Sequence, residues 1–377
     1  MEIKLKGRKR ATVTMVTRFE LYPNLVSVIT NMVEMLKDDF DLRLVIGSDN
    51  DIPEFIIQNC EVITLEKPKI EFKTLVYSYK AVIRAMRCDG LNIVANITQP
   101  YPIGVLLSLA CWFNKRTKAV IRISGDFFDE RNHTKSLVTK IYKIYVYEKM
   151  LLLAFRKAHF VLPIGENLKS KFVSCGFPES KLRVAPQPFL SEPFNLPEGL
   201  DRKKVKQHLG LLPNKITVLF VARLEPNKGI SDLIQIIQGV LQQSDDFQFC
   251  IIGKGSAMSE FSGFKEDHLV LTGFVPRERL HNYYHASNLL VYPTKKDASP
   301  TVLLEALSAE LPIVSTAVGE IPYLVKNIRS SNDQFIEFIL NKKYVKDKKP
   351  MWFNWQSQKR LYRDIYLEVY DSFVGLS

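Results

Sequence analysis

The stretch from Asp297 to Glu305 (DASPTVLLE) carries two acidic side chains with seven residues between them. The residues around Glu305 are apolar, which predicts a buried helix whose polar stripe is Thr301, Glu305 and Ser308. Such a stripe could simply face solvent. It could also aim the Glu305 carboxylate at a pair of ligand hydroxyls, as an acidic residue does for ribose in dinucleotide-binding folds.

The expected start of this helix is suited to an anion. Ser299 is predicted as the N-cap and Pro300 as the first helical residue, where a missing N–H group costs nothing. The free amide groups of Thr301 and Val302 would then point out of the helix, toward the place where a phosphate binds. We expect a strand at residues 288–293 before this loop, a helix ending near residue 309, and a further strand at residues 312–315.

Two cations lie at the end of another predicted strand, in residues 218–229 (VLFVARLEPNKG). Arg223 follows the strand directly, and Lys228 lies on the turn before Gly229 opens a helix. Ligands of open α/β sheets bind outside the carboxyl ends of the strands. A guanidinium and an ammonium group at that edge suit a diphosphate. A solvated turn would carry the same residues.

Three further strand ends carry polar or glycine-rich turns. Gly253 and Val275 lie in two of them (IIGKGS and LTGFVP), which by themselves are ordinary turns. The third, residues 121–130 (IRISGDFFDE), places Asp126 beside Phe127 and Phe128. Asp126 could accept hydrogen bonds from sugar hydroxyls while a phenylalanine covers an apolar sugar face, or it could cap the next helix.

These motifs resemble the retaining GT-B glycosyltransferases of the type-4 class, known as the group 1 sequences. The resemblance rests on the acid-x7-acid segment, on residues 311–314 (LPIV) and on the turn at residues 317–322 (AVGEIP). Asp297 replaces the family's usual Glu, Glu310 stands where a glycine usually ends the helix, and Glu320 replaces the second glycine of the turn. The loop at residues 18–24 also lacks the paired glycines that the family carries after its first strand.

The resemblance implies an α/β fold of GT-B architecture, in which two Rossmann-like domains face a central cleft. It implies an acceptor-binding domain at residues 1–190, a nucleotide-sugar domain at 191–350, and a C-terminal helix at 351–377 that packs back on the first domain. By the same resemblance, Arg223 and Lys228 would bind the donor diphosphate and Glu305 its ribose. The remaining implied contacts are with the nucleoside (Gly253, Val275), the phosphate at the helix start (Ser299, Pro300, Thr301, Val302) and the transferred sugar (Asp126, Asp297).

The activity implied is transfer of a sugar from a nucleotide diphosphate sugar to an acceptor hydroxyl of a glycan or lipid-linked saccharide, with the anomeric configuration retained. We expect no catalytic metal and no cofactor, because no Asp-x-Asp element occurs in the context of a metal-held nucleotide. His281 and His285 share a helix face without a third ligand, and we interpret them as part of a surface helix. The alternatives are a sugar-nucleotide epimerase on the same fold and a catalytically silent binding module. The nucleotide base, the sugar, the acceptor and the linkage stay open.

The secondary-structure pattern agrees with two such domains in 377 residues. Strands and helices alternate, which predicts parallel sheets covered on both faces. A proline-rich stretch at residues 189–200 is expected as the linker. The first-half strands are expected at residues 11–17, 41–47, 61–65, 91–98, 118–125, 159–165 and 182–185, with helices at 24–36, 72–87, 103–113, 135–157 and 166–175.

Charge is concentrated in residues 111–190, which hold 15 basic and 6 acidic residues, a net charge of +9. This field suggests an anionic membrane surface or a phosphorylated acceptor, or it merely keeps the protein soluble; we do not expect nucleic acid to be the partner. Residues 135–157 interleave basic and apolar residues, as a helix lying on an anionic bilayer would. The longest apolar run is too short to span a membrane, no secretory signal is visible, and the five cysteines are scattered. We therefore expect a cytoplasmic protein, either free or on the inner face of a membrane.

Overall fold

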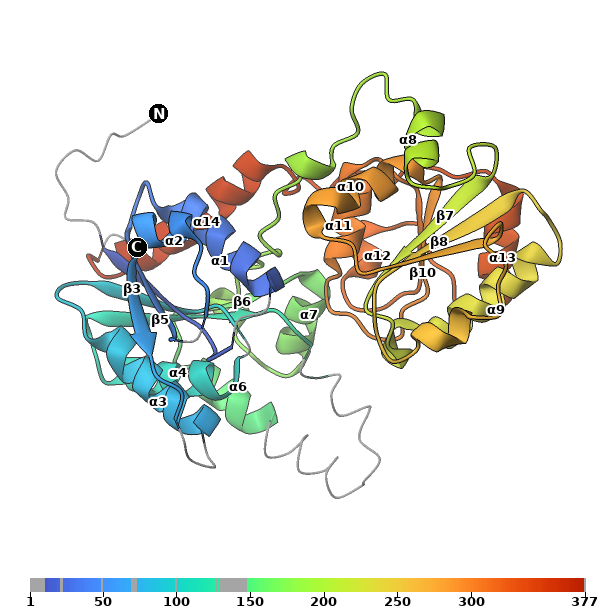
Figure 1. Cartoon of the computed structure of the whole chain (residues 1–377). Helices are drawn as coiled ribbons and strands as arrows, with labels where there is room; N and C mark the ends of the chain where they lie inside the picture. The colour runs from blue at the N-terminus through green and yellow to red at the C-terminus, as the bar shows by residue number, and fades with distance from the viewer. Residues whose placement is uncertain are drawn as a thin grey trace. The chain divides into compact units, whose positions relative to one another are not determined.

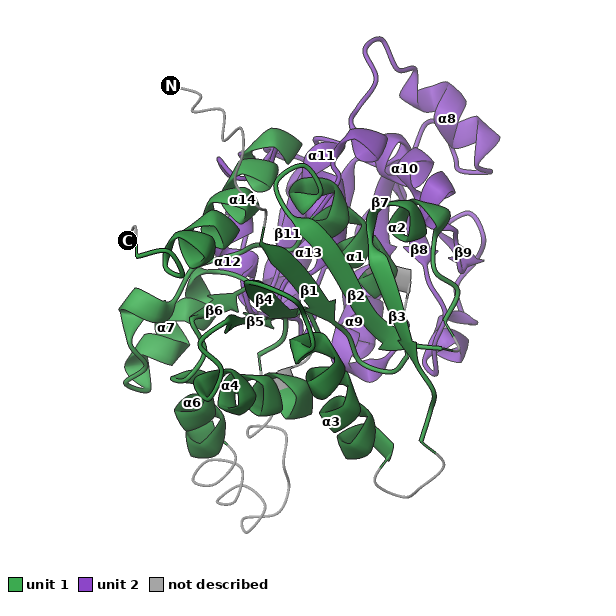
Figure 2. Cartoon of the chain, turned by 90° about the vertical axis from the view of Figure 1, so that its left-hand side faces the viewer, with its two compact units in different colours: residues 1–188, 355–377 green, residues 189–354 purple. Residues whose placement is uncertain are grey.

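The chain folds into two compact units. The structure is a computed structural model that describes residues 11–20, 23–48, 50–68, 73–98, 100–126, 128 and 148–375. The first unit comprises Met1–Pro188 together with Trp355–Ser377, and the second comprises Phe189–Asn354 (Figures 1 and 2). Each unit has its own parallel sheet and its own buried apolar core.

The first unit is built on a six-stranded sheet in the order β3-β2-β1-β4-β5-β6, with every neighbouring pair parallel. The chain moves outward from β1 in one direction and then resumes at β4 in the other. The carboxyl ends of β1 and β4 therefore form a topological switch point, where ligands bind in folds of this type. The strands are β1 (Thr12–Val16), β2 (Asp41–Gly47), β3 (Glu61–Leu65), β4 (Asn92–Asn96), β5 (Thr117–Ile123) and β6 (Phe160–Pro163).

Helices cover both faces of this sheet (Figure 1). Strand residues alternate between the two faces, so that Val13 and Met15 pack with α1 and α14, whereas Val16 packs with α3, α4 and α6. The helices are α1 (Pro23–Leu36), α2 (Glu54–Asn59), α3 (Lys73–Met86), α4 (Val105–Trp112), α6 (Lys149–Phe155), α7 (Glu166–Ser174) and α14 (Trp355–Asp371), with short helical segments at η1 (Pro100–Gly104) and η4 (Glu179–Lys181).

The last helix, α14, belongs to the first unit although the chain reaches it from the second. Tyr362, Tyr366 and Val369 are buried with α1 in one face of the first sheet. The Tyr362 hydroxyl donates a hydrogen bond to the carbonyl oxygen of Pro186 at 2.6 Å. The helix begins at Trp355, two residues after Phe353, which is buried in the core of the second unit.

The second unit has a five-stranded parallel sheet in the order β11-β10-β7-β8-β9. Here the switch point lies between β7 and β10, which are hydrogen-bonded neighbours. The strands are β7 (Ile216–Val221), β8 (Phe247–Ile252), β9 (Leu269–Gly273), β10 (Leu289–Tyr292) and β11 (Ile313–Ser315). The helices are α8 (Arg202–His208), α9 (Ile230–Leu241), α10 (Arg277–Ala286), α11 (Thr301–Ser308), α12 (Ile321–Leu324) and α13 (Asn332–Asn341), with short 3-10 segments η5 (Glu192–Phe194), η6 (Pro226–Lys228) and η7 (Met258–Phe261).

The expected fold class, two parallel α/β domains with a C-terminal helix that returns to the first, is confirmed. One local expectation is wrong. Residues 182–185 form no strand but an isolated bridge between Leu182 and Val161. The amides of Arg183 and Ala185 donate to the carbonyls of Val161 and Pro163, and the ladder goes no further because Pro163 has no N–H group to return a bond. The helix expected at 135–157 lies largely outside the described residues, and its described end is α6. Within the described residues, no helix is both long and apolar enough to cross a membrane.

Candidate functional site

The loops that follow β7 and β10 meet at the switch point of the second sheet. The ammonium group of Lys228 lies 2.6 Å from Oδ2 of Asp297, and the two side chains are only 14% and 17% exposed. The hydroxyl of Tyr292, the last residue of β10, donates to the same oxygen at 2.9 Å. A carboxylate, an ammonium and a phenol are thus brought together from positions far apart in the sequence.

Arg223 stands beside this cluster with an exposed side chain. Burial, together with the neighbouring Asp297 carboxylate, raises the pKa of Tyr292 well above its usual range, while the positive charge of Arg223 acts in the opposite direction. The guanidinium therefore lies within electrostatic reach of the cluster. Tyr292 remains a neutral hydrogen-bond donor at physiological pH.

Two glycines allow the backbones of these loops to approach closely. Gly229 has a φ of 74°, and a Cβ atom there would lie 1.9 Å from the carbonyl oxygen of Pro293. Gly319 has a φ of 56°, and its Cβ would lie 2.2 Å from the carbonyl oxygen of Asp297. The amide of Glu320 also donates to the carbonyl of Ala298 at 2.9 Å. The turn at residues 317–322 thus holds the backbone of the Asp297 loop.

Helix α11 starts one residue later than expected. Pro300 has extended backbone angles (φ −71°, ψ 122°), so it is the N-cap residue and Thr301 is the first helical residue. The assignment of Ser299 as N-cap is therefore wrong, since helical geometry cannot begin at a residue with that ψ. No side-chain cap forms at Pro300 among the described residues, and the amide of Leu303 makes the first bond, to Pro300. The amides of Thr301 and Val302 lie in the first turn of α11, where helix amides have no partner within the helix.

Glu305 is buried one turn further along α11. Its Oε2 accepts a hydrogen bond from the Tyr284 hydroxyl at 2.7 Å, and the Arg277 guanidinium lies 3.9 Å from Oε1. Burial raises the pKa of the Glu305 carboxyl from 4.5 to about 7, despite the lowering effects of Tyr284 and Arg277. Its polar stripe is not solvated, because Ser308 is buried and donates to the carbonyl of Leu304 at 2.9 Å.

The turns after β8 and β9 extend the same edge of the sheet. Gly253 has a φ of 141°, and a Cβ atom there would lie 1.8 Å from the carbonyl oxygen of Ala222, so this turn packs directly on the strand end before Arg223. The hydroxyl of Ser256 donates to the Glu225 carboxylate at 2.7 Å and joins the two loops. Val275 is half-buried against the core just before α10.

Asp126 lies in the first unit, and its carboxylate already has partners. Oδ1 accepts from the amide of Phe128 at 3.1 Å, and Oδ2 pairs with Lys171 of α7. Phe128 is buried and packs edge-on against Phe172, so the expectation that it covers a sugar is wrong. Phe127, the other aromatic residue named for that role, lies outside the described residues.

The partners of the two acids were not found by sequence reasoning. Tyr284 and Arg277 lie on α10, and only the fold brings them to Glu305. Tyr292 ends a strand five residues before Asp297, and a polar aromatic residue at the end of a buried strand could have been a signal. His285 is buried rather than exposed, and its ring lies 3.0 Å from the Phe194 carbonyl oxygen. In the part of the chain that the structure describes, no three His, Cys, Asp or Glu side chains gather as metal ligands.

Fold and site together define an α/β protein in which basic side chains and the start of α11 lie at one edge, the switch point of its second sheet. Residues 201–334, which include this edge, match the family model described as Glycosyl transferases group 1. The resemblance of this part of the chain to group 1 glycosyltransferases is thereby confirmed.

Individual proteins to which the chain is similar are also named as glycosyltransferases. The chain is similar to the GPI3 subunit of phosphatidylinositol N-acetylglucosaminyltransferase from Saccharomyces cerevisiae (strain YJM789), with 32% identity over 39% of this chain and 32% of that protein. It is similar to the amylovoran biosynthesis glycosyltransferase AmsK of Erwinia amylovora, with 28% identity over 46% of this chain and 43% of that protein. The chain thus spans less than half of the length of these curated relatives.

The fold extends the similarity to both units. The solved structure of Anabaena Alr3699/HepE in complex with UDP and glucose matches with a TM-score of 0.67 and 14% identity, covering 96% of this chain and 99% of that one. At this identity the match shows the fold alone. The GT-B architecture is therefore confirmed.

Proposed function

We propose that this protein is a retaining glycosyltransferase, which moves a sugar from a nucleoside diphosphate sugar to an acceptor hydroxyl without a catalytic metal. The observation that carries the proposal is the meeting of Lys228, Asp297 and Tyr292 beside Arg223 and the open start of α11. This edge lies inside the segment that matches group 1 glycosyltransferases. The arrangement offers positive charge where a diphosphate would lie.

In this proposal the positive groups stabilise the leaving diphosphate. Arg223, Lys228 and the amide of Thr301 carry or direct positive charge, and preorganised groups of this kind are often the largest contribution to such a step. The contact between Lys228 and Asp297 fixes the ammonium group before the donor arrives. Fixing it in advance lowers the cost of reorganisation during the reaction.

The other site residues would position the donor. Glu305 would accept hydrogen bonds from the ribose hydroxyls, and the backbone near Gly253 and Val275 would meet the nucleoside. Asp297 and Asp126 would contact the transferred sugar. With no nucleophile assigned for a double displacement, the bond from the anomeric carbon to the phosphate oxygen breaks as the acceptor oxygen bonds on the same face, and the phosphate oxygen takes the acceptor proton.

A nucleoside diphosphate is expected to stabilise the fold. The solved relative that binds UDP makes UDP the first ligand to test, with GDP and ADP beside it. A ligand present at 100 times its dissociation constant adds about 2.7 kcal/mol to the free energy of unfolding. Thermal-shift measurements should show this effect for one diphosphate and not for its nucleoside. A chain that responds to none of the three would contradict the donor site.

We also propose that the acceptor is a glycan or lipid-linked saccharide and that the first unit binds an anionic membrane surface. The names of the two relatives point to lipid and polysaccharide acceptors. The supporting observation is an exposed apolar surface on neighbouring helices α4 and α6, in which Phe113 is 82% exposed. This surface, the α4–α6 patch, comprises Leu109, Trp112, Phe113, Met150 and Leu153.

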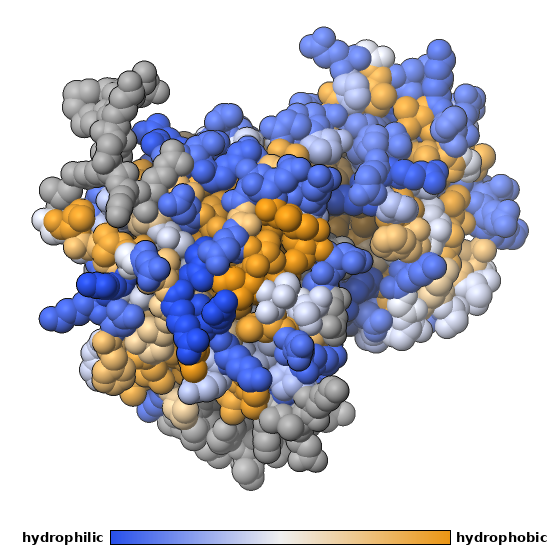
Figure 3. Space-filling view, turned by 60° about the vertical axis from the view of Figure 1, so that its left-hand side comes forward, coloured by the Kyte–Doolittle hydropathy of each residue, from blue (hydrophilic) through white to orange (hydrophobic). Residues whose placement is uncertain are grey.

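Basic residues lie close in sequence to the α4–α6 patch, within the segment 111–190 of net charge +9. The ammonium group of Lys157 lies 3.6 Å from the centre of the Trp112 ring. The neighbouring basic residues of α4, α6 and their ends are Lys115, Arg116, Lys149 and Arg156. On the face drawn in Figure 3, apolar side chains reach the surface of the first unit between hydrophilic ones. Apolar side chains together with basic ones suit the boundary between anionic headgroups and acyl chains.

Vesicle binding tests this patch. The protein should sediment with vesicles that contain phosphatidylserine and should remain in solution with neutral vesicles. Binding should weaken as the screening length falls from about 10 Å at 0.1 M salt to about 3 Å at 1 M. The double variant Phe113→Ser, Leu153→Ser should be released, whereas Val345→Ser, an equally exposed apolar residue of the second unit, should bind like the wild type. Equal binding of all three proteins would contradict the patch.

A further inference from the structure

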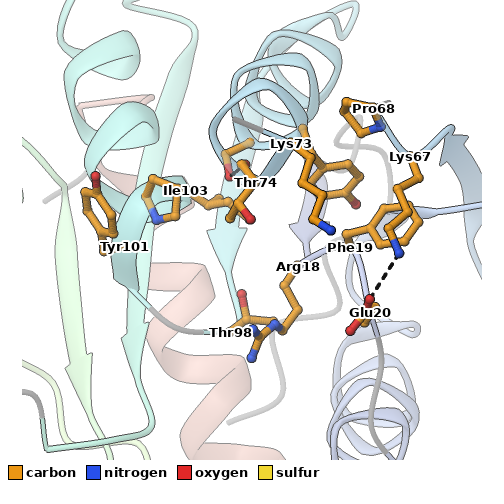
Figure 4. A pocket seen from close by; sticks show the side chains of 13 residues that line it. Arg18, Phe19, Glu20, Lys67, Pro68, Lys73, Thr74, Thr98, Tyr101 and Ile103 are labelled. Carbon is orange, nitrogen blue, oxygen red and sulfur yellow. Dashed lines mark hydrogen bonds and ion pairs between the residues drawn. The ribbon is translucent and has the colours of Figure 1, made fainter. Parts of the chain in front are cut away.

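The first unit contains a cavity at the switch point of its own sheet. Its volume is about 350 Å³, and its lining comes from the residues that follow β1, β3 and β4 and from the first turns of α3 (Figure 4). Ligands of parallel sheets bind outside the carboxyl ends of the strands, at the point where the strand order reverses. The cavity thus has the place that a ligand site has in such folds, and no residue of it belongs to the donor site described above.

Basic side chains dominate the cavity. Arg18 follows β1, Lys67 follows β3 and Lys73 begins α3. Figure 4 shows Arg18, Lys67 and Lys73 around the opening, with Glu20 beside Lys67. Glu20, which lies 3.3 Å from Lys67, is the one acidic residue among the described residues that line the cavity. Among the described lining residues three are basic and one is acidic, a composition that fits an anionic ligand.

A buried hydroxyl in the cavity wall lacks a partner. Tyr77 is 2% exposed, and its hydroxyl makes no hydrogen bond with any described residue. The nearby Thr17 hydroxyl donates instead to the carbonyls of Arg18 at 2.9 Å and Val45 at 3.3 Å. Burial raises the pKa of the Tyr77 phenol, and the side chain of Thr17 acts in the opposite direction, so the group stays a neutral donor. Buried polar groups are nearly always hydrogen-bonded, so a ligand oxygen is the natural partner here.

The rest of the lining suits a sugar. Phe19 and Tyr101 supply aromatic surface, and Thr74 supplies an exposed hydroxyl group. The hydroxyls of Ser78 and Thr98 also line the cavity, but they donate to the Thr74 carbonyl and to Asn96. Tyr101 is half exposed at the opening. A volume of this size lies at the lower end of ligand pockets, which range over about 300–1,000 Å³. It would hold one phosphorylated hexose better than a long oligosaccharide.

We propose that this cavity binds a phosphate group carried by the acceptor, next to the acceptor's sugar. Arg18 and Lys73 would hold the phosphate oxygens, and the Tyr77 hydroxyl would donate to one of them or to a sugar oxygen. The loop at residues 18–20, which lacks the glycines of the family pattern, thereby gains a role through its side chains. The identification of the ligand as the acceptor rests on the proposed transferase function, whereas the anion site itself does not.

Binding of α-D-glucose 1-phosphate to the full chain tests the proposal by calorimetry. The titration is done with saturating UDP, so that the donor site is occupied. Glucose 1-phosphate should bind, and glucose should not. Affinity should rise between pH 5 and pH 7.5, because the second phosphate ionisation lies near pH 6. Arg18→Gln and Lys73→Gln should each weaken binding about tenfold or more, since each removes a charged hydrogen-bond donor.

Two variants serve as controls. Lys80→Gln changes another exposed lysine of α3 outside the cavity lining, and it should bind like the wild type. Tyr77→Phe keeps the ring and should lose several-fold in affinity. Absence of binding, or equal binding by Lys73→Gln and wild type, would overturn the cavity site. Binding that UDP abolishes and Arg223→Ala removes would assign the anion to the donor site instead. Failure of UDP, GDP and ADP alike to bind would count against the transferase and leave the cavity result standing.

Discussion

Replacing Arg223 by alanine is expected to lower the turnover number by about 10²–10³ while the fold stays intact. Arg223 has an exposed side chain at the carboxyl end of β7, so its removal leaves no cavity in the core. In the proposed reaction its guanidinium faces the charge that grows on the leaving diphosphate. Loss of one such donor from a developing oxyanion has an effect of this size.

Steady-state rates with the preferred donor measure this effect, and thermal unfolding checks the fold. Lys265→Ala is the matched control, because Lys265 is an exposed cation of the same unit away from the β7 and β10 loops. The control should retain the wild-type rate. If the turnover number of Arg223→Ala stays within a few-fold of the wild-type value, Arg223 does not contact the donor diphosphate.

Glu305→Gln is expected to stabilise the protein at pH 8 and not at pH 4.5. In the folded state burial raises the pKa of Glu305 from 4.5 to about 7. Between these values the unfolded chain loses its proton while the folded chain keeps it, so wild-type stability falls as the pH rises. The free energy of unfolding falls by about 1.4 kcal/mol per pH unit, so the wild type loses about 3 kcal/mol of stability by pH 8. Glutamine does not ionise and can still accept the hydrogen bond from Tyr284, so the variant avoids this loss of stability.

The same variant should bind the nucleotide less well. Two ribose hydroxyls that donate to a carboxylate make charge-assisted hydrogen bonds, and their weakening should cost about tenfold or more in affinity at pH 8. Wild-type affinity should fall more steeply from pH 8 to pH 6 than that of Glu305→Gln, because in the wild type Glu305 takes up a proton in addition to the terminal phosphate of the nucleotide.

Urea unfolding and calorimetry at both pH values measure the two effects. Glu337→Gln, an exposed acid of α13, is the control and should follow the wild type in each. Unchanged nucleotide affinity in Glu305→Gln would make Glu305 a structural acid, held by Tyr284 and Arg277 alone.

The elements that carry the proposed donor site were predictable because their sequence signals are local. Alternating apolar strands, Gly229 after a basic turn and the apolar residues around Glu305 each act over a few residues. Even there, details followed from backbone angles that the residue types do not determine. Pro300 adopts an extended ψ, which moves the helix start to Thr301. Glu310 takes a left-handed φ of 53° where the family pattern has glycine.

The contacts between distant elements could not be predicted. The Lys228 and Asp297 side chains are 69 residues apart in sequence, and their contact depends on β7 lying next to β10. The Tyr284 hydroxyl reaches Glu305 from a different helix. The cavity around Tyr77 likewise gathers residues that follow three strands. The spacing of apolar residues predicts whether a segment is a helix or a strand. Which strand ends meet depends on the order of the strands in the sheet, which that spacing does not determine.

The most direct test of the transferase is to follow each nucleotide sugar in the presence of EDTA with the full chain. Mass spectrometry detects the nucleoside diphosphate, and NMR reports the anomeric configuration of the sugar released to water or to an added acceptor. We expect one donor to yield diphosphate and sugar in equal amounts, with the configuration of the donor, and Arg223→Ala to yield almost none. Binding without turnover of any donor, conversion of the donor to its epimer, or a sugar released with inverted configuration would contradict a retaining, metal-independent transferase.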